Sequence, residues 1–272
     1  MPAGRSSRPI ITLLTDFGVK DGYVGTMKGV IASLAPDALV VDICHEVPPQ
    51  DIARGGFIWA AAIPYFPRGT VHVGVVDPGV GSRRKILAVE GKGCVFLAPD
   101  NGMVGYVLPR SEMKRAISVE RREHFLATPS ATFHGRDVFA PVAARIATGL
   151  HLEKLGPSCR RFSMAAMPRP RSRRARWGGR SAIEERGQIV YVDSFGNAIT
   201  NLRPRRGSHL LSLEARDLRL RGISAAYQDV APRSALVVAG STGHLEIAVN
   251  RGRADRELGL AVGDEVVAFW GT

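Results

Sequence analysis

Residues 71–84 read VHVGVVDPGVGSRR, and the apolar run from Val71 to Val76 predicts a buried strand that ends at Asp77. A turn rich in Pro and Gly follows and leads into Arg83 and Arg84. In open α/β sheets, ligands bind at the carboxyl ends of the strands. The stretch therefore places a carboxylate and a guanidinium where a ligand site is expected. Alone, it is equally compatible with a tight turn and two solvated arginines.

The same pattern of a strand that ends in an acid occurs twice more. Residues 10–15, IITLLT, are followed by Asp16, and the run 94–97 leads into Asp100 and Asn101. Because the ends of parallel strands meet at one edge of a sheet, we expect these polar side chains to converge. This convergence favours a functional site over three unrelated turns.

Strands and helices alternate in the first half of the chain, which predicts an α/β domain with a mainly parallel central sheet. Asp21 and Asp137 are expected to cap the helices that follow them. Residues 103–130 show no regular pattern. The predicted strands are 10–15, 39–43, 71–76, 86–89 and 94–97, and the predicted helices are 23–34, 52–63 and 138–146.

The second half is punctuated by Gly, Pro and Asp and contains only short apolar runs, which predicts a small all-β domain. We expect an N-terminal domain at 1–165, an arginine-rich linker at 166–186 and a C-terminal domain at 187–272. The predicted strands of the C-terminal domain are 189–192, 210–213, 218–220, 236–238, 245–249 and 266–270.

The formal net charge is +12, from 37 Lys and Arg against 25 Asp and Glu. Much of it lies in residues 160–186, where nine arginines face two glutamates, a net +7. The stretch lacks the interleaved aromatics of a platform for single-stranded nucleic acid, so we expect no nucleic-acid partner.

Neither a membrane span nor a signal peptide is expected, because no apolar run is long enough. The three cysteines, Cys44, Cys94 and Cys159, are widely spaced and form no CxxC pair, which fits a reducing cytoplasm and predicts no zinc site.

Six stretches occur in an order that resembles one family over residues 11–250: LLTDFGVKDGYVGTMKGVI, VVDPGVGSRR, APDNG, TFHGRDVFAP, DSFGNAITN and STGHLEIAVN. The chain resembles the S-adenosyl-L-methionine hydroxide adenosyltransferases, which are related to the fluorinase and chlorinase that use the same substrate. The resemblance implies a barrel-like C-terminal domain. It also implies a homotrimer in which the substrate lies between the N-terminal domain of one subunit and the C-terminal domain of the next.

The implied reaction is hydrolysis of S-adenosyl-L-methionine to adenosine and L-methionine. By resemblance, an Asp–Arg–His triad surrounds the attacking water, and the matching residues are Asp77, Arg84 and His134. The sulfonium leaves as a neutral thioether, so neither a general acid nor a metal is required, and no cofactor is expected. A neutral histidine can act as a base, but the sequence leaves open which of the three residues takes the proton.

The resemblance also assigns residues to the substrate. Asp16 is expected at the ribose hydroxyls, Asp193 at the methionine ammonium and Ser241 near its carboxylate. Phe195 and Asn197 are expected at the adenine, by stacking and by hydrogen bonds, and Asn101 lines the same pocket. Residues 45–50 lack the tryptophan that packs on the ribose in the halogenases, and Thr242 stands where those relatives carry arginine.

Four other functions stay open on the sequence alone. The chain can be a protein that binds or senses a nucleoside with little turnover, or an enzyme that resembles the halogenases. Strand-end aspartates also occur in metal-dependent phosphohydrolases, although no HxxxH or clustered ligand pattern is present. Binding of nucleic acid through residues 160–186 is the fourth, and its signature is a steep salt dependence.

Overall fold

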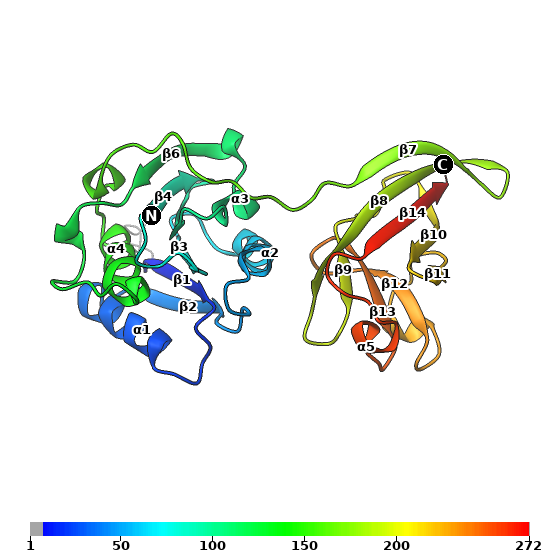
Figure 1. The fold of residues 1–272 in the computed structure, drawn as a ribbon, viewed down its shortest axis with the longest axis horizontal. Coiled ribbons are helices and arrows are strands. Elements are labelled where there is room, and N and C mark those ends of the chain that lie inside the picture. The colour runs from blue at the N-terminus through cyan, green and yellow to red at the C-terminus, as the bar shows by residue number, and fades with distance from the viewer. Residues whose placement is uncertain (1–7, 272) are drawn as a thin grey trace, which may run out of the picture. The chain divides into compact units, whose positions relative to one another are not determined.

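The computed structural model describes residues 8–271, and the chain divides into two compact units, Met1–Ala166 and Met167–Thr272 (Figure 1). None of the helices among the described residues is both long and apolar enough to cross a membrane.

The first unit is an α/β domain built on one six-stranded sheet. Its strands are β1 (Ile10–Thr15), β2 (Leu39–Cys44), β3 (Val71–Val75), β4 (Ile86–Gly91), β5 (Cys94–Pro99) and β6 (Met113–Ser118). Its α-helices are α1 (Tyr23–Leu34), α2 (Ile52–Ala62), α3 (Val104–Val107) and α4 (Ala140–Ala147). Short helical turns are η1 (Ile63–Tyr65), η2 (Arg110–Glu112), η3 (Arg122–His124), η4 (Gly135–Phe139) and η5 (Leu152–Leu155).

The strand order is β2-β1-β3-β5-β4-β6, in which β2, β1, β3 and β5 are parallel and β4 and β6 are antiparallel to their neighbours. The predicted mainly parallel sheet is therefore confirmed. Strand β6, in the segment that showed no pattern, was missed; it lies at one edge of the sheet.

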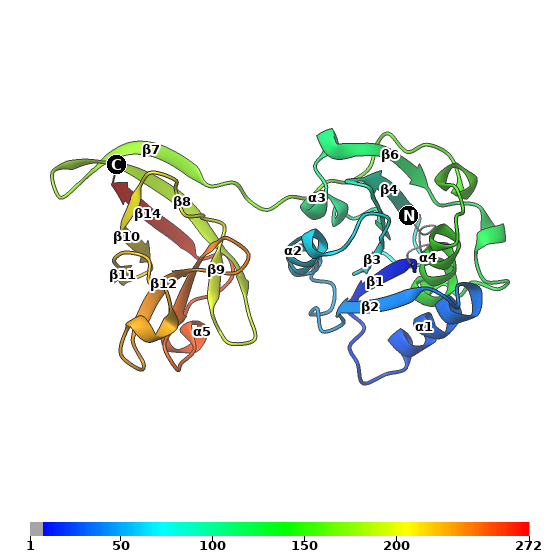
Figure 2. The same cartoon turned by 180° about the vertical axis from the view of Figure 1, so that it is seen from behind.

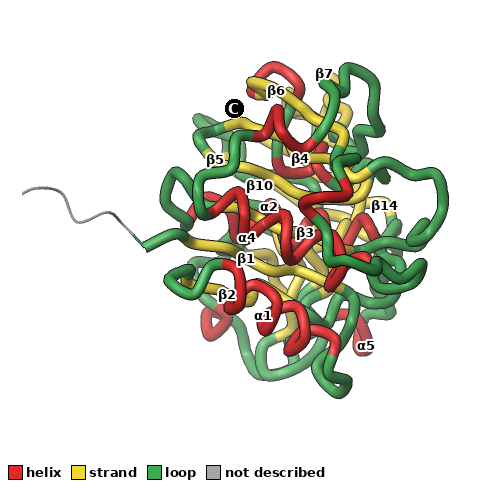
Figure 3. Tube along the Cα trace, turned by 90° about the vertical axis from the view of Figure 1, so that its left-hand side faces the viewer, coloured by secondary structure: helices red, strands yellow, loops and turns green. Residues whose placement is uncertain are grey.

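Helices cover both faces of this sheet, which explains why β1 and β3 read as continuous apolar runs. On one face, Met27 of α1 and Phe139 pack against Leu13 and Val73. On the other, Trp59 of α2 packs with Phe96 and Leu14. Figure 3 faces the side that carries α1 and α4. Asp16, Asp77 and Asp100 follow the carboxyl ends of β1, β3 and β5.

Two predicted helix caps are wrong. Gly22, not Asp21, occupies the N-cap of α1, and no side chain caps that helix. Asp137 lies inside the π-helical turn η4 and is buried. Its carboxylate accepts the backbone N–H of Ser130 at 2.8 Å and the guanidinium of Arg136 at 2.5 Å. It therefore holds the preceding loop instead of the helix end.

The second unit is an antiparallel sheet that nearly closes into a barrel, with strand order β11-β10-β14-β8-β9-β13-β12 and β7 paired to β8. Strands β11 and β12 at the two ends of this order contact each other (Figure 2). The strands are β7 (Arg171–Trp177), β8 (Arg180–Val192), β9 (Ala198–Thr200), β10 (His209–Ala215), β11 (Leu218–Leu220), β12 (Ala235–Ala239), β13 (Leu245–Val249) and β14 (Glu265–Gly271). The helices are η6 (Tyr227–Asp229) and α5 (Ala254–Glu257).

The linker predicted at 166–186 is wrong, because β7 and the first half of β8 form a hairpin there. The buried carboxylate of Glu184 accepts Arg173 at 2.7 Å and Arg186 at 2.6 Å, and Trp177 packs on Phe269. The arginines of β7 are therefore exposed side chains of an edge strand, where positive charge also discourages pairing with another sheet. Because arginines occupy most positions of β7, it lacks the apolar run by which the other strands were predicted.

The buried histidine of β3 makes the fold sensitive to acid. The ring of His72 stacks on Phe96 with 5.3 Å between centroids, and Nδ1 lies 2.9 Å from Thr12 Oγ1. Burial lowers the pKa of His72 to about 4. The unfolded chain, with a histidine pKa near 6.5, therefore binds more protons between about pH 4 and pH 6.5. Stability is full above that window and is lost as the pH falls through it.

We expect His72 to cost the fold about 2 kcal/mol between pH 7.5 and pH 5.0. Urea unfolding at both pH values, in the wild type and in His72→Phe, measures this contribution. The phenyl ring keeps the stacking and removes the titration, so the variant should lose less free energy of unfolding on acidification. His244, whose pKa burial and Arg203 also lower to about 4, titrates in both proteins. Equal losses in the two proteins would contradict the assignment.

Candidate active site

Two of the three strand-end aspartates lie close together at the carboxyl edge of the sheet. Asp16 follows β1 and Asp77 follows the neighbouring β3. Burial raises the pKa of Asp16, and the negative charge of Asp77 adds to this. The backbone N–H of Gln50 donates to Asp16 Oδ2 at 2.8 Å. Asp16 thus presents a half-buried carboxylate that disfavours its charged form and gains from a hydrogen-bond donor on a ligand.

The third aspartate has a structural role. Asp100 Oδ1 accepts the backbone N–H of Ser163 at 2.6 Å, which ties the returning chain to the end of β5. The neighbouring Asn101 donates from Nδ2 to the carbonyl of Val76 at 2.7 Å, and its Oδ1 accepts the N–H of Met103 at 3.2 Å. Asn101 therefore holds the end of β3, one residue before Asp77. Its predicted contact with a ligand stays a prediction.

Asp77 and Arg84 form a buried ion pair across the glycine-rich turn. Arg84 Nε lies 2.9 Å from both carboxylate oxygens of Asp77, and a terminal guanidinium nitrogen bonds Oδ2. Their side chains are only 5% and 11% exposed. Gly81 has φ of 76°, and a Cβ there would lie 2.4 Å from the carbonyl oxygen of Ala131. Only glycine fits, so this residue allows the turn to fold Arg84 back onto Asp77.

His134 completes the set through the same guanidinium. Arg84 Nη2 lies 2.9 Å from His134 Nδ1. A guanidinium can only donate, so Nδ1 must accept, and the neutral ring carries its proton on Nε2. Burial lowers the pKa of His134, and the charge of Arg84 lowers it further. The ring is therefore a neutral hydrogen-bond donor at Nε2. Its one in-plane lone pair, on Nδ1, accepts the hydrogen bond from Arg84.

The loop that carries His134 is fixed by a wide turn and by aromatic packing. His134 directly precedes the π-helical turn η4, a local irregularity that is frequent at functional sites. A Cβ at Gly135 would lie 2.9 Å from the ring of Phe17, which packs edge-on against Phe133. These contacts hold the imidazole in position beside the end of β1.

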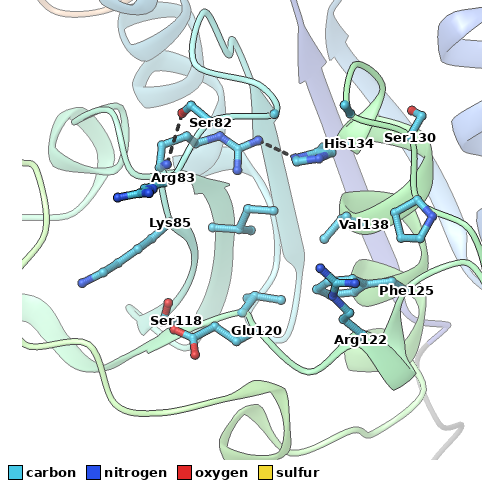
Figure 4. Close-up of a pocket in the computed structure, with 16 residues that line it drawn as sticks. Ser82, Arg83, Lys85, Ser118, Glu120, Arg122, Phe125, Ser130, His134 and Val138 are labelled. Carbon is cyan, nitrogen blue, oxygen red and sulfur yellow. Dashed lines mark hydrogen bonds between the residues drawn. The ribbon is translucent and has the colours of Figure 1, made fainter.

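A cleft of about 460 Å³ opens beside this set. Figure 4 shows His134 facing the segment Ser82–Lys85, with its ring joined to the guanidinium of Arg84. The cleft is lined by three basic residues, Arg83, Lys85 and Arg122, and by one acidic residue, Glu120. The site is therefore open to solvent and electropositive at its rim.

The second unit carries its own polar cluster at the turn between β8 and β9. Asp193 accepts the backbone N–H of Asn197 at Oδ1 (2.9 Å) and its side-chain Nδ2 at Oδ2 (3.0 Å). Asn197 Nδ2 also lies 3.4 Å from the hydroxyl of Tyr227. Phe195 projects from the turn and is 75% exposed, so its ring face is available for stacking. Ser241 is exposed in a separate turn after β12.

This cluster borders a cavity of about 830 Å³, large enough for a nucleoside with a side chain. The residues that line it are Phe195, Asn197, Tyr227, Arg233, Val249, Arg251, Gly252, Arg253, Arg256 and Glu257. Sequence reasoning missed Tyr227, which lies in an irregular segment without a motif. Across residues 8–271, no group of three or more His, Cys, Asp or Glu is arranged to hold a metal ion.

The predicted site residues thus fall into two sets, each inside one unit. Asp16, Asp77, Arg84 and His134 belong to the first, and Asp193, Phe195 and Asn197 belong to the second. The first set has polar groups that can orient a small nucleophile. The second has an aromatic face, an amide and a carboxylate that suit an adenine and a cation.

Comparison with known proteins agrees with this division. The family model for the SAM hydroxide adenosyltransferase N-terminal domain matches residues 11–156, and the model for the C-terminal domain matches residues 187–267. An (R)-S-adenosyl-L-methionine hydrolase from Salinispora tropica is 38% identical, covering 95% of this chain and 97% of the relative.

A fluorinase from Actinopolyspora mzabensis is more distant, at 28% identity over 72% of each chain. Among solved structures, an uncharacterized conserved protein from Thermotoga maritima superposes with a TM-score of 0.84 at 34% identity. That match covers 95% of this chain and 99% of the other.

Proposed function

The chain belongs to the SAM hydroxide adenosyltransferase family, and we propose that it hydrolyses S-adenosyl-L-methionine to adenosine and L-methionine. The match to curated (R)-S-adenosyl-L-methionine hydrolases over nearly the whole chain supports this reaction. The more distant fluorinase match makes a halogenase the second candidate.

The arrangement of Asp77, Arg84 and His134 is the observation that carries the proposal. Attack at the ribose C5′ breaks the C5′–S bond, and the electron pair leaves on a neutral thioether. The difficulty lies in the nucleophile, because water is weak and must be oriented. Three buried or half-buried polar groups, joined by hydrogen bonds through one guanidinium, are suited to that task.

We assign separate parts to the three residues. His134 Nε2–H donates to the water oxygen and directs a lone pair at C5′. Asp77 accepts a hydrogen bond from the water and favours hydroxide character, and Arg84 holds that carboxylate in position. Water forms the C5′–O bond, the C5′–S pair goes to sulfur, and one proton leaves through Asp77 to solvent. The sequence left open which of the three residues takes the proton. Because His134 Nδ1 accepts from Arg84 and Nε2 carries the ring proton, we do not assign His134 as the base.

The remaining site residues are assigned to the substrate. Asp16 binds the ribose hydroxyls, Asp193 binds the methionine ammonium and Ser241 contacts its carboxylate. Phe195 stacks on the adenine and Asn197 bonds its edge. The pKa of Asp16, raised by burial despite the N–H of Gln50, supports a carboxylate whose charge further donors on a ligand would stabilise.

We propose a homotrimer in which the two sets of residues come from different subunits. The first unit has the groups for the nucleophile but no stacking face assigned to the adenine. The second has Phe195 and Asn197 for the adenine but no group assigned to the water. Each set is incomplete by itself, which supports shared sites. The three free cysteines support a reducing cytoplasm as the location.

We expect the purified enzyme to convert the (R)-sulfonium epimer of S-adenosyl-L-methionine at least about tenfold faster than the (S) epimer. Inversion at sulfur exchanges the methyl and methionine branches, so C5′ and the ammonium cannot both reach their contacts in the wrong epimer. Adenosine and methionine formed from each separated epimer are measured by chromatography, with a chelator present throughout.

The same assay decides among the alternatives. Loss of activity with chelator would favour a metal-dependent hydrolase. A 5′-halo-5′-deoxyadenosine formed in fluoride or chloride would favour a halogenase. One equivalent of bound adenosine without turnover would favour a nucleoside sensor. Equal rates for the two epimers would contradict the stereochemical preference alone.

A further inference from the structure

Glu246 is a buried carboxylate that the residues assigned above leave without a role. It lies in β13, between Val238 of β12 and Ile199 of β9, and is only 5% exposed. Among residues 8–271, no hydrogen bond or ion pair is made to its carboxylate. A buried charge without a partner is costly, so a fold retains one chiefly where a ligand supplies the partner.

The backbone around Glu246 is shaped to fit its carboxylate. A Cβ at Gly240 would lie 1.6 Å from Glu246 Oε1 and 2.1 Å from its Cδ, so any larger residue there would displace the carboxylate from its present position. Gly240 begins the turn that carries Ser241, and its N–H donates to the carbonyl of His244 at 2.9 Å. The carboxylate therefore lies against the turn that carries one predicted substrate contact.

The groups that face Glu246 are mostly acidic. Burial raises the pKa of Glu246 to about 6, and the charge of Asp193 contributes to this. Burial raises the pKa of Tyr227, and the charges of Glu246 and Asp193 raise it further. His244, which directly precedes β13, stays neutral because burial and Arg203 lower its pKa. Val238 and Ile199 beside it are apolar. Arg253 interacts with the charge of Asp193, but its guanidinium donates to Asp255 at 2.8 Å, so among residues 8–271 no cation is paired with Glu246.

The second carboxylate of the pair, that of Asp193, lies next to the nucleoside-sized cavity beside Phe195. Asn197 bonds both Asp193 and the Tyr227 hydroxyl, and Asn197 and Tyr227 line that cavity. Asp193 thus lies within one hydrogen bond of residues that line the cavity beside Phe195. Primary ammonium is a compact cation with three donors, enough to bond two carboxylates at once.

We propose that Glu246 and Asp193 together form the subsite for the substrate α-ammonium, with Glu246 as a specificity-determining residue. This inference rests on the proposed hydrolysis of S-adenosyl-L-methionine. It selects adenosyl sulfonium compounds that carry an amine over those that do not. It also makes substrate affinity, and not the chemical step, depend on the state of Glu246.

The test compares two ligands in Glu246→Gln, which keeps the shape of the side chain and removes its charge. The first is S-adenosyl-L-methionine, read as KM, and the second is 5′-deoxy-5′-(dimethylsulfonio)adenosine, which lacks the amine and is read as an inhibition constant. We expect the KM to rise about 10- to 100-fold, the size of a lost hydrogen bond to a charged group. The inhibition constant should change less than about twofold.

Glu265→Gln is the control, because this exposed glutamate of β14 pairs only with Arg186 on the barrel surface. An unchanged KM in Glu246→Gln, or an equal rise for both ligands, would overturn the proposal. If the variant does not fold, the wild type still tests it: KM for S-adenosyl-L-methionine should rise as the pH falls below about 6, while the inhibition constant of the amine-free ligand stays flat.

Failure of the proposed function gives a different result. A wild type that never releases adenosine from S-adenosyl-L-methionine would refute the hydrolysis. Calorimetric binding of S-adenosyl-L-methionine to the wild type and to Glu246→Gln would then still report whether Glu246 binds the ammonium.

Discussion

Replacing Asp77 by asparagine is expected to lower kcat about 10³-fold with little change in KM. The substitution keeps the size of the side chain but removes the charge that holds the Arg84 guanidinium and accepts a hydrogen bond from the water. Loss of one preorganised polar group at a reacting centre typically costs 10²- to 10³-fold, and here the position of Arg84 is disturbed as well. Adenosine release under saturating substrate measures the effect.

Unfolding is the main competing explanation for that loss, because Arg84 is only 11% exposed and would lack its counter-charge. Thermal unfolding and retained adenosine binding by Asp77→Asn are therefore measured alongside. Activity within tenfold of the wild type, in a folded variant, would contradict the role given to the triad.

The same variant tests whether sites are shared between subunits. Asp77→Asn damages only the residues around the water, and Asp193→Asn damages only the ammonium subsite. If each site combines two chains, co-refolded mixtures of the two impaired variants should show more activity at low substrate than either variant alone. Mixtures no more active than either variant, or a monomer in sedimentation velocity, would contradict the homotrimer.

The strand ends were predictable because a single physical rule governs them. Buried parallel strands read as unbroken apolar runs, and the acid that ends each run lies at the ligand edge of the sheet. Asp16 and Asp77 follow this rule. Asp100 has the same sequence context but instead ties down residue 163. Sequence position identifies the edge and does not reveal what each carboxylate bonds.

Features that depend on contacts distant in sequence were missed. The arginine-rich segment predicted as a linker is a hairpin, since Glu184 and Phe269 supply partners that the local pattern does not contain. The sequence predicts Asp137 as a helix cap, because a π-helical turn has no signature in composition. Glu246 did leave a signal: it is the one acid in the apolar run LEIAV. A charged residue at a strand position that should be buried is a reason to look for a ligand.

Replacing His134 by alanine is expected to lower kcat about 10²- to 10³-fold, and replacing it by glutamine should recover most of that loss. The structure has Nδ1 accept from Arg84, so the ring can offer only Nε2–H to the water. Glutamine reproduces both functions, since its Oε1 can accept from Arg84 and its Nε2 can donate. We expect His134→Gln to remain within about tenfold of the wild type.

A histidine that acts as the base predicts the opposite result. Glutamine cannot take a proton, so His134→Gln would then be as inactive as His134→Ala. The pH profile separates the two cases further. Burial and Arg84 lower the pKa of His134, so a permanently neutral donor leaves kcat/KM flat from about pH 7 upwards, and the glutamine variant shares that flat profile. An inactive His134→Gln variant, together with a wild-type kcat/KM that falls at acidic pH, would instead identify His134 as the base. Asp77 would then serve only to hold Arg84 in position.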